Sequence, residues 1–284
     1  MIILASDEKL TSEVKQNALS LGFDKVGVAE AERADKTPMF FTSPFSILKD
    51  AKSIISLCIK YPEGTFEQSK EDLFVVLSTF ATVRQTLHNE LREKSMRLTR
   101  FLEEKGYSAV PLDPNISVDE RRWTSCMLSH RYVGQIAGLG DIGANNFLLT
   151  PEWGPRIELA SIITNAPLKS DGPRLAGKIY DETCRNCFRC VEACPPQALG
   201  REKVPPYNFD LNRHLWGIQG LVSLSKIEIP PDDWIEARPT ALIVLPKYSA
   251  KYPFIKEYQK WQREKGDFPF CQICAEVCPV GKKK

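Results

Sequence analysis

Cysteines constrain this 284-residue chain more than any other feature, because seven of the nine lie in two short motifs that each end in Cys-Pro. The members are Cys184, Cys187, Cys190 and Cys194 in the first motif, and Cys271, Cys274 and Cys278 in the second. The first motif has the spacing C-x2-C-x2-C-x3-C-P, which is the bacterial ferredoxin run. The sequence therefore predicts iron–sulfur clusters.

In proteins with two clusters, the last cysteine of such a run ligates the other cluster. We expect two [4Fe-4S] clusters, each split across the two motifs. The first would be held by Cys184, Cys187, Cys190 and Cys278, and the second by Cys194, Cys271 and Cys274. Zinc and disulfides are the alternatives, but zinc sites take four ligands in two pairs rather than a run that ends in Cys-Pro.

The second cluster lacks one cysteine, because two cubanes need eight ligands and the motifs supply seven. His214 lies between the motifs, and imidazole ligates cluster iron in Rieske centres. The alternatives are a helical histidine without a metal, or a [3Fe-4S] cluster without an eighth ligand. Cys58 falls in a predicted core strand, where packing accounts for it. Cys126 is a weaker candidate.

Strands and helices alternate before the cysteine motifs. Helices are predicted over residues 6–22, 70–105 and 118–137, and strands over 25–29, 53–59 and 157–164, with a strand edge or a turn at 110–114. The composition changes at residues 169–173, where a linker is plausible. The pattern predicts an α+β fold: an α/β-like domain over residues 1–172, then a ferredoxin-like module over residues 173–284.

The charge balance excludes a strong general attraction to nucleic acid or anionic membranes. The net charge is +2, from 38 basic and 36 acidic residues. The sequence shows neither an export signal nor an apolar run of the roughly 18 residues that a membrane span needs. We therefore expect a cytoplasmic protein without a membrane span, whose cysteines are thiolates rather than disulfides.

Residues 137–154, which begin Ala-Gly-Leu-Gly-Asp-Ile-Gly-Ala-Asn-Asn, resemble the signature of epoxyqueuosine reductases. They are also similar to the core of the corrinoid reductive dehalogenases, whose domain is nitroreductase-like. Residues 48–57 resemble the segment that enters a core strand in these proteins, and the two cysteine motifs follow in the same order. The resemblance implies cobalamin, a corrinoid, held base-off between the two domains and supplied with electrons by the clusters.

The resemblance places corrinoid contacts in the Gly-rich loop. The candidate residues are Gly138, Gly140, Ile142, Gly143, Asn145 and Asn146. Glycines let a backbone approach a flat macrocycle, and the asparagines offer side-chain hydrogen bonds. The loop lacks a preceding strand, so dinucleotide binding is a poor interpretation. The alternative is that the glycines only shape a turn.

Two residues are candidates for proton delivery. Epoxyqueuosine reductases have an aspartate upstream of their Gly-rich signature as the proton donor, and Asp113 is the nearest match here. Such an acid needs a raised pKa to hold its proton. His130 is the second candidate. The alternatives are a turn-forming aspartate before Pro114 and a satisfied helical histidine.

The chain departs from the reductases in three ways. His214 stands where they have a further cysteine, and their usual aromatic–acid–His stretch is not evident around Phe80. The helical-repeat extension found in many of them does not follow Pro279. These departures argue against tRNA as the substrate. We expect a corrinoid-dependent iron–sulfur reductase, fed by reduced ferredoxin or flavodoxin, that acts on a small-molecule or corrinoid-linked substrate. The alternatives are an electron-transfer protein and an activator that reduces another protein's corrinoid; flavin is a weaker cofactor candidate.

Overall fold

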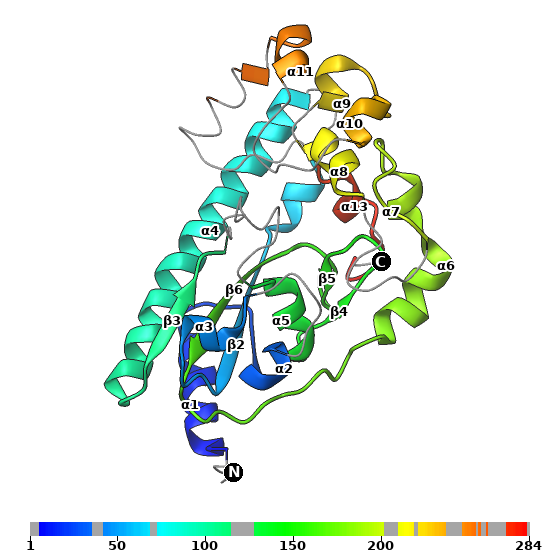
Figure 1. The fold of residues 1–284 in the computed structure, drawn as a ribbon. Coiled ribbons are helices and arrows are strands. Elements are labelled where there is room, and N and C mark those ends of the chain that lie inside the picture. Colours follow the sequence, from blue (N-terminus) through cyan, green and yellow to red (C-terminus); the bar gives the residue numbers. More distant parts are fainter. Residues whose placement is uncertain are drawn as a thin grey trace.

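A four-stranded antiparallel sheet forms the centre of the N-terminal part of the computed structural model (Figure 1). Its strands lie in the order β1 (Lys25–Glu30), β2 (Ser53–Lys60), β6 (Ile157–Thr164) and β3 (Ala109–Leu112). The structure describes residues 6–35, 42–68, 73–114, 128–201, 210–218, 221–236, 246–253, 255–256, 260 and 271–282. All four strands are predicted from the sequence, and their positions are confirmed.

The central strands β2 and β6 are paired along their whole length, from Ser53 opposite Thr164 to Lys60 opposite Ile157. In β2 every residue before Lys60 is buried. A strand that buries both of its faces needs a layer on each side of the sheet. Helices supply both layers.

Helices α1 (Glu8–Ser20) and α4 (Leu73–Glu104) cover one face of the sheet. The helix predicted over residues 6–22 is confirmed as α1, and it is capped by the Asp7 carboxylate, which accepts a hydrogen bond from the N–H of Leu10 at 2.8 Å. Leu91 of α4 is fully buried in the same core as the sheet. Of the described helices, even α4, the longest, lacks a stretch apolar enough for a membrane span.

The other face is covered by α5 (His130–Ile136), together with α2 (Ala31–Asp35) and α3 (Pro44–Ile47). A short 3-10 helix, η1 (Glu63–Phe66), follows β2. The helix predicted over residues 118–137 is described only at its end, as α5, because residues 115–127 lie outside the described residues.

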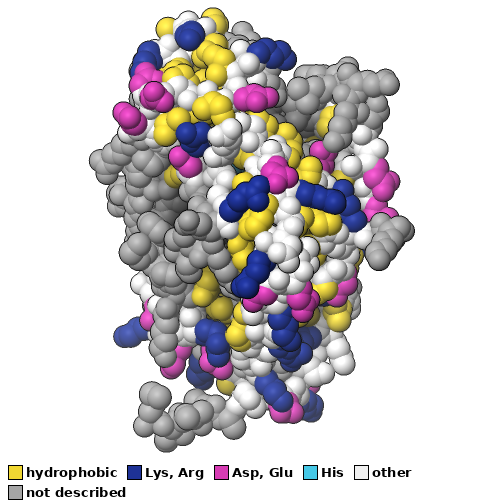
Figure 2. Space-filling model, turned by 90° about the vertical axis from the view of Figure 1, so that its right-hand side faces the viewer, with side chains coloured by type: hydrophobic (Ala, Val, Ile, Leu, Met, Phe, Trp, Pro, Cys, Tyr) yellow, Lys and Arg dark blue, Asp and Glu magenta, His cyan; other side chains and the backbone are white. Residues whose placement is uncertain are grey.

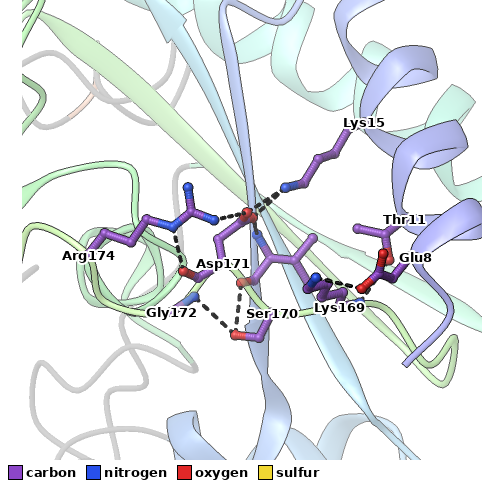
Figure 3. A network of polar contacts seen from close by, with 9 residues as sticks. Glu8, Thr11, Lys15, Lys169, Ser170, Asp171, Gly172 and Arg174 are labelled. Carbon is purple, nitrogen blue, oxygen red and sulfur yellow. Dashed lines mark hydrogen bonds and ion pairs between the residues drawn. The ribbon is translucent and has the colours of Figure 1, made fainter. Parts of the chain in front are cut away.

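The segment predicted to be a linker is held against the edge strand β1 instead (Figure 3). The N–H of Asp171 donates to the carbonyl of Val28, and the Asp171 carboxylate accepts from the Val28 N–H, both at 2.9 Å. The same carboxylate pairs with Lys15 at 2.6 Å and with Arg174 at 3.3 Å. The chain therefore leaves the sheet along a fixed path.

Within the Gly-rich segment the structure has a small hairpin rather than only a loop. Strands β4 (Asp141–Ile142) and β5 (Leu148–Leu149) pair in antiparallel fashion. The turn between them contains Asn146, whose φ is +67°, a left-handed conformation that Asn adopts more readily than most residues. This hairpin packs toward the cysteine motifs.

Beyond residue 172 the described elements are helices. The π-helical turn η3 (Tyr180–Cys184) and helices α6 (Arg185–Cys187), α7 (Arg189–Glu192) and α13 (Ile273–Glu276) carry the cysteine motifs. Between the motifs lie α8 (Leu211–Ile218), α9 (Leu221–Ser225), α10 (Asp232–Ile235) and α11 (Pro246–Lys251). These form their own aromatic core around Trp216, Trp234 and Tyr248. The α+β character is confirmed, whereas the ferredoxin-like module stays a prediction.

Candidate functional site

Four cysteines from the two motifs line one cavity. They are Cys184, Cys187, Cys190 and Cys278, and residues Ala144, Asn145 and Leu149 of the β4–β5 hairpin line the same cavity. The first three cysteines and the fourth are far apart in sequence. The structure therefore brings together the four side chains that the cross-over of motifs predicts for the first cluster.

The first motif wraps this cavity because its backbone reverses between two short helices. Cys187 ends α6, and Cys190 lies in α7. Phe188, between them, has φ +45° and ψ +16°, in the left-handed region. A left-handed residue redirects the chain sharply, which lets cysteines on both sides face one cavity.

Burial and mutual repulsion disfavour thiolates in this cavity. Burial, together with the nearby thiols of Cys278 and Cys184, raises the pKa of Cys190 to about 12. Burial also raises the pKa of Cys278 to about 11, against the opposing effects of the Val280 N–H and the Arg156 guanidinium. Several sulfurs close enough to repel each other are stabilised as thiolates by bound cations, which is the chemistry of a metal cluster.

The remaining three motif cysteines also gather in one place. Burial is the main cause of the raised pKa of Cys271, and the nearby Cys194 adds to it. The pKa of Cys274 is raised by burial and then by Cys271, Cys190 and Cys194. Helix α13 packs on α7, which brings the motifs together. The predicted second ligand set therefore also lies together.

Among the described residues, no three His, Cys, Asp or Glu side chains are placed to hold a single metal ion.

His214 lies half-buried on α8. Burial, together with the positive charge of Arg131, lowers its pKa to about 4. Arg131 in turn donates to the carbonyl of Asn146 at 2.7 Å in the β4–β5 turn. A neutral imidazole is the form that ligates iron. The role of His214 as eighth ligand stays a prediction.

Of the other two cysteines, Cys58 lies apart from these sets. Cys58 is fully buried in β2 among Leu139, Leu148 and Leu159, and burial raises its pKa strongly. A neutral buried thiol is a packing residue, as its strand position predicts. Cys126 lies outside the described residues.

The glycines of the Gly-rich segment are explained by contacts within the protein. A Cβ on Gly138 would lie 2.6 Å from the carbonyl oxygen of Gly172, and a Cβ on Gly140 would lie 2.2 Å from that of Leu149. A Cβ on Gly143 would lie 2.5 Å from the Leu149 side chain. Close packing therefore requires these glycines, as the turn-forming alternative predicts.

The two asparagines of this segment are buried. Asn145 donates to the carbonyl of Cys274 at 3.3 Å and accepts from the N–H of Phe147 at 3.2 Å, so both ends of its amide have protein partners. Asn146 is 8% exposed, and Ile142 is half-buried. Asn145 links the hairpin to the second cysteine motif, a contact that the sequence did not indicate.

Asp113 and His130, the two candidates for proton delivery, lie next to each other. Nε2 of His130 bonds the backbone carbonyl of Asp113 at 2.8 Å, and Nδ1 bonds the hydroxyl of Ser161 at 2.9 Å. A carbonyl only accepts, so Nε2 carries the proton and Nδ1 accepts from Ser161. Burial lowers the pKa of His130 to about 4, so this side chain is neutral at pH 7. It is a satisfied helical histidine.

The carboxylate of Asp113 is half-exposed and forms a two-pronged ion pair with Arg92, with distances of 2.9 and 3.1 Å. An adjacent guanidinium favours the ionised carboxylate, whereas a proton donor must hold its proton. The role of Asp113 as proton donor stays a prediction. The role requires the Asp113 carboxylate to leave its ion pair with Arg92, because the pair favours the ionised form.

Asp141 is a structural residue that sequence reasoning did not single out. It is 1% exposed, and one carboxylate oxygen accepts from the Gln135 amide and the N–H of Gly177, each at 2.8 Å. The other oxygen accepts from the N–H of Tyr180 at 2.9 Å. Asp141 therefore fixes the start of η3, which leads directly to Cys184.

A second buried carboxylate, Glu158 of β6, lies outside the cysteine site. It accepts from Arg84 at 3.2 Å and bonds Nε2 of His88 at 3.0 Å and the hydroxyl of Tyr61. Burial alone would raise its pKa, but the charge of Arg84 and the bonds from His88 and Tyr61 outweigh it and hold the pKa at about 2. The group anchors α4 to the sheet.

The face that carries α6 and α7 shows basic and acidic side chains interspersed with apolar ones (Figure 2). Arg185 pairs with Asp181 at 2.9 Å, and Arg201 pairs with Glu192 at 2.7 Å. Arg189 is exposed at the rim of the four-cysteine cavity. Charge of both signs therefore lies around the cavity mouth.

Solved structures share this fold. An epoxyqueuosine reductase in complex with a tRNA stem loop superposes with a TM-score of 0.57 at 21% identity, covering 96% of this chain and 65% of that one. A reductive dehalogenase, whose structure was described as suggesting a mechanism for B12-dependent dehalogenation, gives 0.59 at 18% identity, covering 94% and 38%. The fold is therefore the one that these two groups of reductases share.

Sequence comparison agrees. The epoxyqueuosine reductase of Bacillus anthracis is 28% identical over 214 residues, 68% of this chain and 53% of that protein. That of Cyclobacterium marinum is 29% identical over 222 residues, 69% and 66%. The tetrachloroethene reductive dehalogenase of Desulfitobacterium hafniense is 36% identical over 156 residues, 54% and 24%.

The chain is a homologue of these reductases, which confirms the resemblance found in the sequence. It spans about half the length of the Bacillus relative. No protein-family model matches the chain.

Proposed function

We propose that this chain is an iron–sulfur reductase that carries electrons through two clusters to a corrinoid and then to a substrate. The observation that carries the proposal is the cavity lined by four cysteines from two distant motifs, with three further cysteines gathered beside it. Homology to reductases supports the same class of reaction.

The cysteine sets fit the clusters chemically. The first cluster would be held by Cys184, Cys187, Cys190 and Cys278, and the second by Cys194, Cys271 and Cys274, with His214 as the eighth ligand. When bound, such clusters supply one-electron transfer. The protein's own part is to exclude water and to fix the thiols: Asp141 fixes the first motif, and Asn145 contacts the second.

The corrinoid is supported by the relatives, one of which is described by B12-dependent dehalogenation. The proposed corrinoid contacts are Gly138, Gly140, Ile142, Gly143, Asn145 and Asn146 of the Gly-rich segment. An added Cβ on any of the three glycines would meet protein atoms, so one side of this backbone is packed, and Asn145 has protein partners at both ends of its amide.

Reduced ferredoxin or flavodoxin is the proposed electron donor, and a small-molecule or corrinoid-linked compound is the proposed substrate. A tRNA stem loop is bound by one structural relative, so tRNA is a second substrate class for the same chemistry. The chain covers 65% of that relative, and the two proposed units of this chain, residues 1–172 and 173–284, lie within that match.

Anaerobic reconstitution tests the function. The purified protein is loaded with iron and sulfide, incubated with hydroxocobalamin, and passed through a desalting column and a size-exclusion column. A stoichiometric corrinoid that elutes with the protein, with the EPR spectrum of a base-off cobalt(II) form, is the expected result.

Clusters without a retained corrinoid would reject the corrinoid-dependent reductase in favour of an electron-transfer protein. If the protein retains no corrinoid but reduces the corrinoid of a second protein, it acts as an activator. The absorbance spectrum of the same sample also reveals any flavin.

A further inference from the structure

Arg156 joins the N-terminal sheet to the second cysteine motif. It directly precedes β6, and its guanidinium is half-buried. Nη1 donates to the carbonyls of Ala275 at 3.4 Å and Cys278 at 3.2 Å, and Nη2 donates to the carbonyl of Val280. The Arg156 guanidinium thus binds three backbone carbonyls at and around Cys278, the cysteine that completes the first cavity.

A second contact holds the same segment independently of charge. Gly154 and Gly281 have φ values of +56° and +66°, and their backbones pack directly on each other. A Cβ on Gly154 would lie 2.1 Å from the carbonyl oxygen of Val280, and a Cβ on Gly281 would lie 2.3 Å from the N–H nitrogen of Gly154. The second motif therefore lies against the turn that carries Arg156, with no room for a side chain between them.

The charge of Arg156 matters because a cluster becomes more negative by one charge when it is reduced. A fixed cation beside a ligand stabilises the reduced form, and net charge near a cluster is one of the factors that set its potential. Arg156 is half-buried and held by three carbonyls, so water screens its charge less than that of a fully exposed side chain. Arg189 is also beside the cavity, but it is exposed.

The buried acid near this cavity has the opposite charge. Asp141 contacts the N–H groups of Gly177 and Tyr180, at the start of the turn that ends in Cys184. A carboxylate on the Cys184 side of the cavity favours the oxidised cluster. Arg156 lies on the Cys278 side, and its positive charge opposes the effect of Asp141.

We propose that Arg156 is a positioning residue that holds the second motif so that Cys278 completes the first cavity, and that its half-buried, carbonyl-bound charge raises the reduction potential of the cluster bound there. The inference rests on the proposed function only in that the cavity binds a cluster. The inference adds that the charge of Arg156 helps to decide which of the two clusters accepts the electron.

The test uses the anaerobically reconstituted full chain and the variants Arg156→Gln, Arg156→Lys and Arg189→Gln. Iron is counted, and the midpoint potential of the first cluster is measured by EPR-monitored titration. The signal is assigned as the one lost in Cys278→Ala. Arg189→Gln is the matched control, because it removes the same charge from the exposed rim of the cavity.

At the wild-type midpoint, Arg156→Gln should lower the ratio of reduced to oxidised first cluster about tenfold, a shift of about 59 mV for one electron. Arg189→Gln should shift the ratio by a much smaller factor. Arg156→Lys keeps the charge, so its midpoint should match wild type. It should still lose iron to a chelator faster, because an ammonium does not reproduce the planar fork.

An unchanged midpoint in Arg156→Gln, or an equal shift in Arg189→Gln, would overturn the proposal. If Arg156→Gln loses the first cluster, Arg156→Lys decides: a wild-type midpoint supports the charge effect, and a midpoint shifted down refutes it. Wild-type protein that binds no cluster would instead refute the proposed function, and this result appears before any variant is compared.

Discussion

Gly154→Ala should break the contact between the sheet and the second cysteine motif. The added Cβ would lie 2.1 Å from the Val280 carbonyl oxygen and 2.9 Å from its carbon. A relaxed carbon–oxygen contact is about 3.3 Å, so Val280 must retreat by roughly 1 Å. The left-handed φ of +56° adds backbone strain of about 1–2 kcal/mol.

Gly106→Ala is the matched control for strain alone. Gly106 has φ +85°, also left-handed, but a Cβ there would meet nothing within 4 Å. It lies just past the end of α4, in another part of the fold from the cysteine motifs. Both variants thus carry the left-handed strain, and only Gly154→Ala displaces the second motif.

Displacement of Val280 draws Cys278 away from the other three cysteines of the cavity, because the two residues share one short turn. Iron should fall from about eight to about four per chain in Gly154→Ala, and stay near eight in Gly106→Ala. Iron and sulfide analysis with EPR measures this, and far-UV circular dichroism verifies that both variants are folded. A Gly154→Ala protein with a full iron count and wild-type spectra would refute the reasoning.

The remaining predictions concern three other side chains. His214→Ala should change the EPR signal of the second cluster only, and an unchanged spectrum would remove His214 from the ligand set. Asp141→Ala should lower the apparent Tm more than Asp141→Asn, because it leaves two buried N–H groups without an acceptor, at about 1–3 kcal/mol each; equal Tm values would contradict this. Glu158→Gln should cost about 3 kcal/mol at pH 7, since the pKa of Glu158 is held at about 2 against an ordinary 4.5. This stabilisation is complete above the unfolded-state pKa and is lost as the pH falls toward 2. The wild-type Tm should therefore approach that of Glu158→Gln in acid, and a difference independent of pH would contradict the assignment.

Local patterns were enough to predict the sheet and its first helix. The apolar runs at residues 53–59 and 157–164 become the central strands β2 and β6, which bury both faces. Asp7 precedes an amphipathic stretch and caps α1. The short-range spacing of the first motif predicted that Cys184, Cys187 and Cys190 share one cavity, and the cross-over rule for two-cluster proteins added the distant Cys278.

Features that depend on distant contacts could not be predicted in this way. Arg156 appears in the sequence as one charged residue before a strand, and nothing nearby indicates carbonyl partners in the second motif. The Gly-rich segment was interpreted as a ligand loop, which stays a prediction, and the sequence did not indicate that its glycines pack against Leu149 and Gly172. The aromatic core around Trp216 was missed because its short helices lack a long periodic pattern.

The ligand sets are tested most directly by comparing Cys184→Ala, Cys278→Ala and Cys271→Ala after anaerobic reconstitution. Each variant is examined by iron analysis and by EPR of the dithionite-reduced protein. Because Cys184 and Cys278 line one cavity, their variants should lose the same cluster signal, and Cys271→Ala should lose the other. Loss of one common signal in Cys278→Ala and Cys271→Ala, with a different signal lost in Cys184→Ala, would show clusters confined to single motifs and contradict the account.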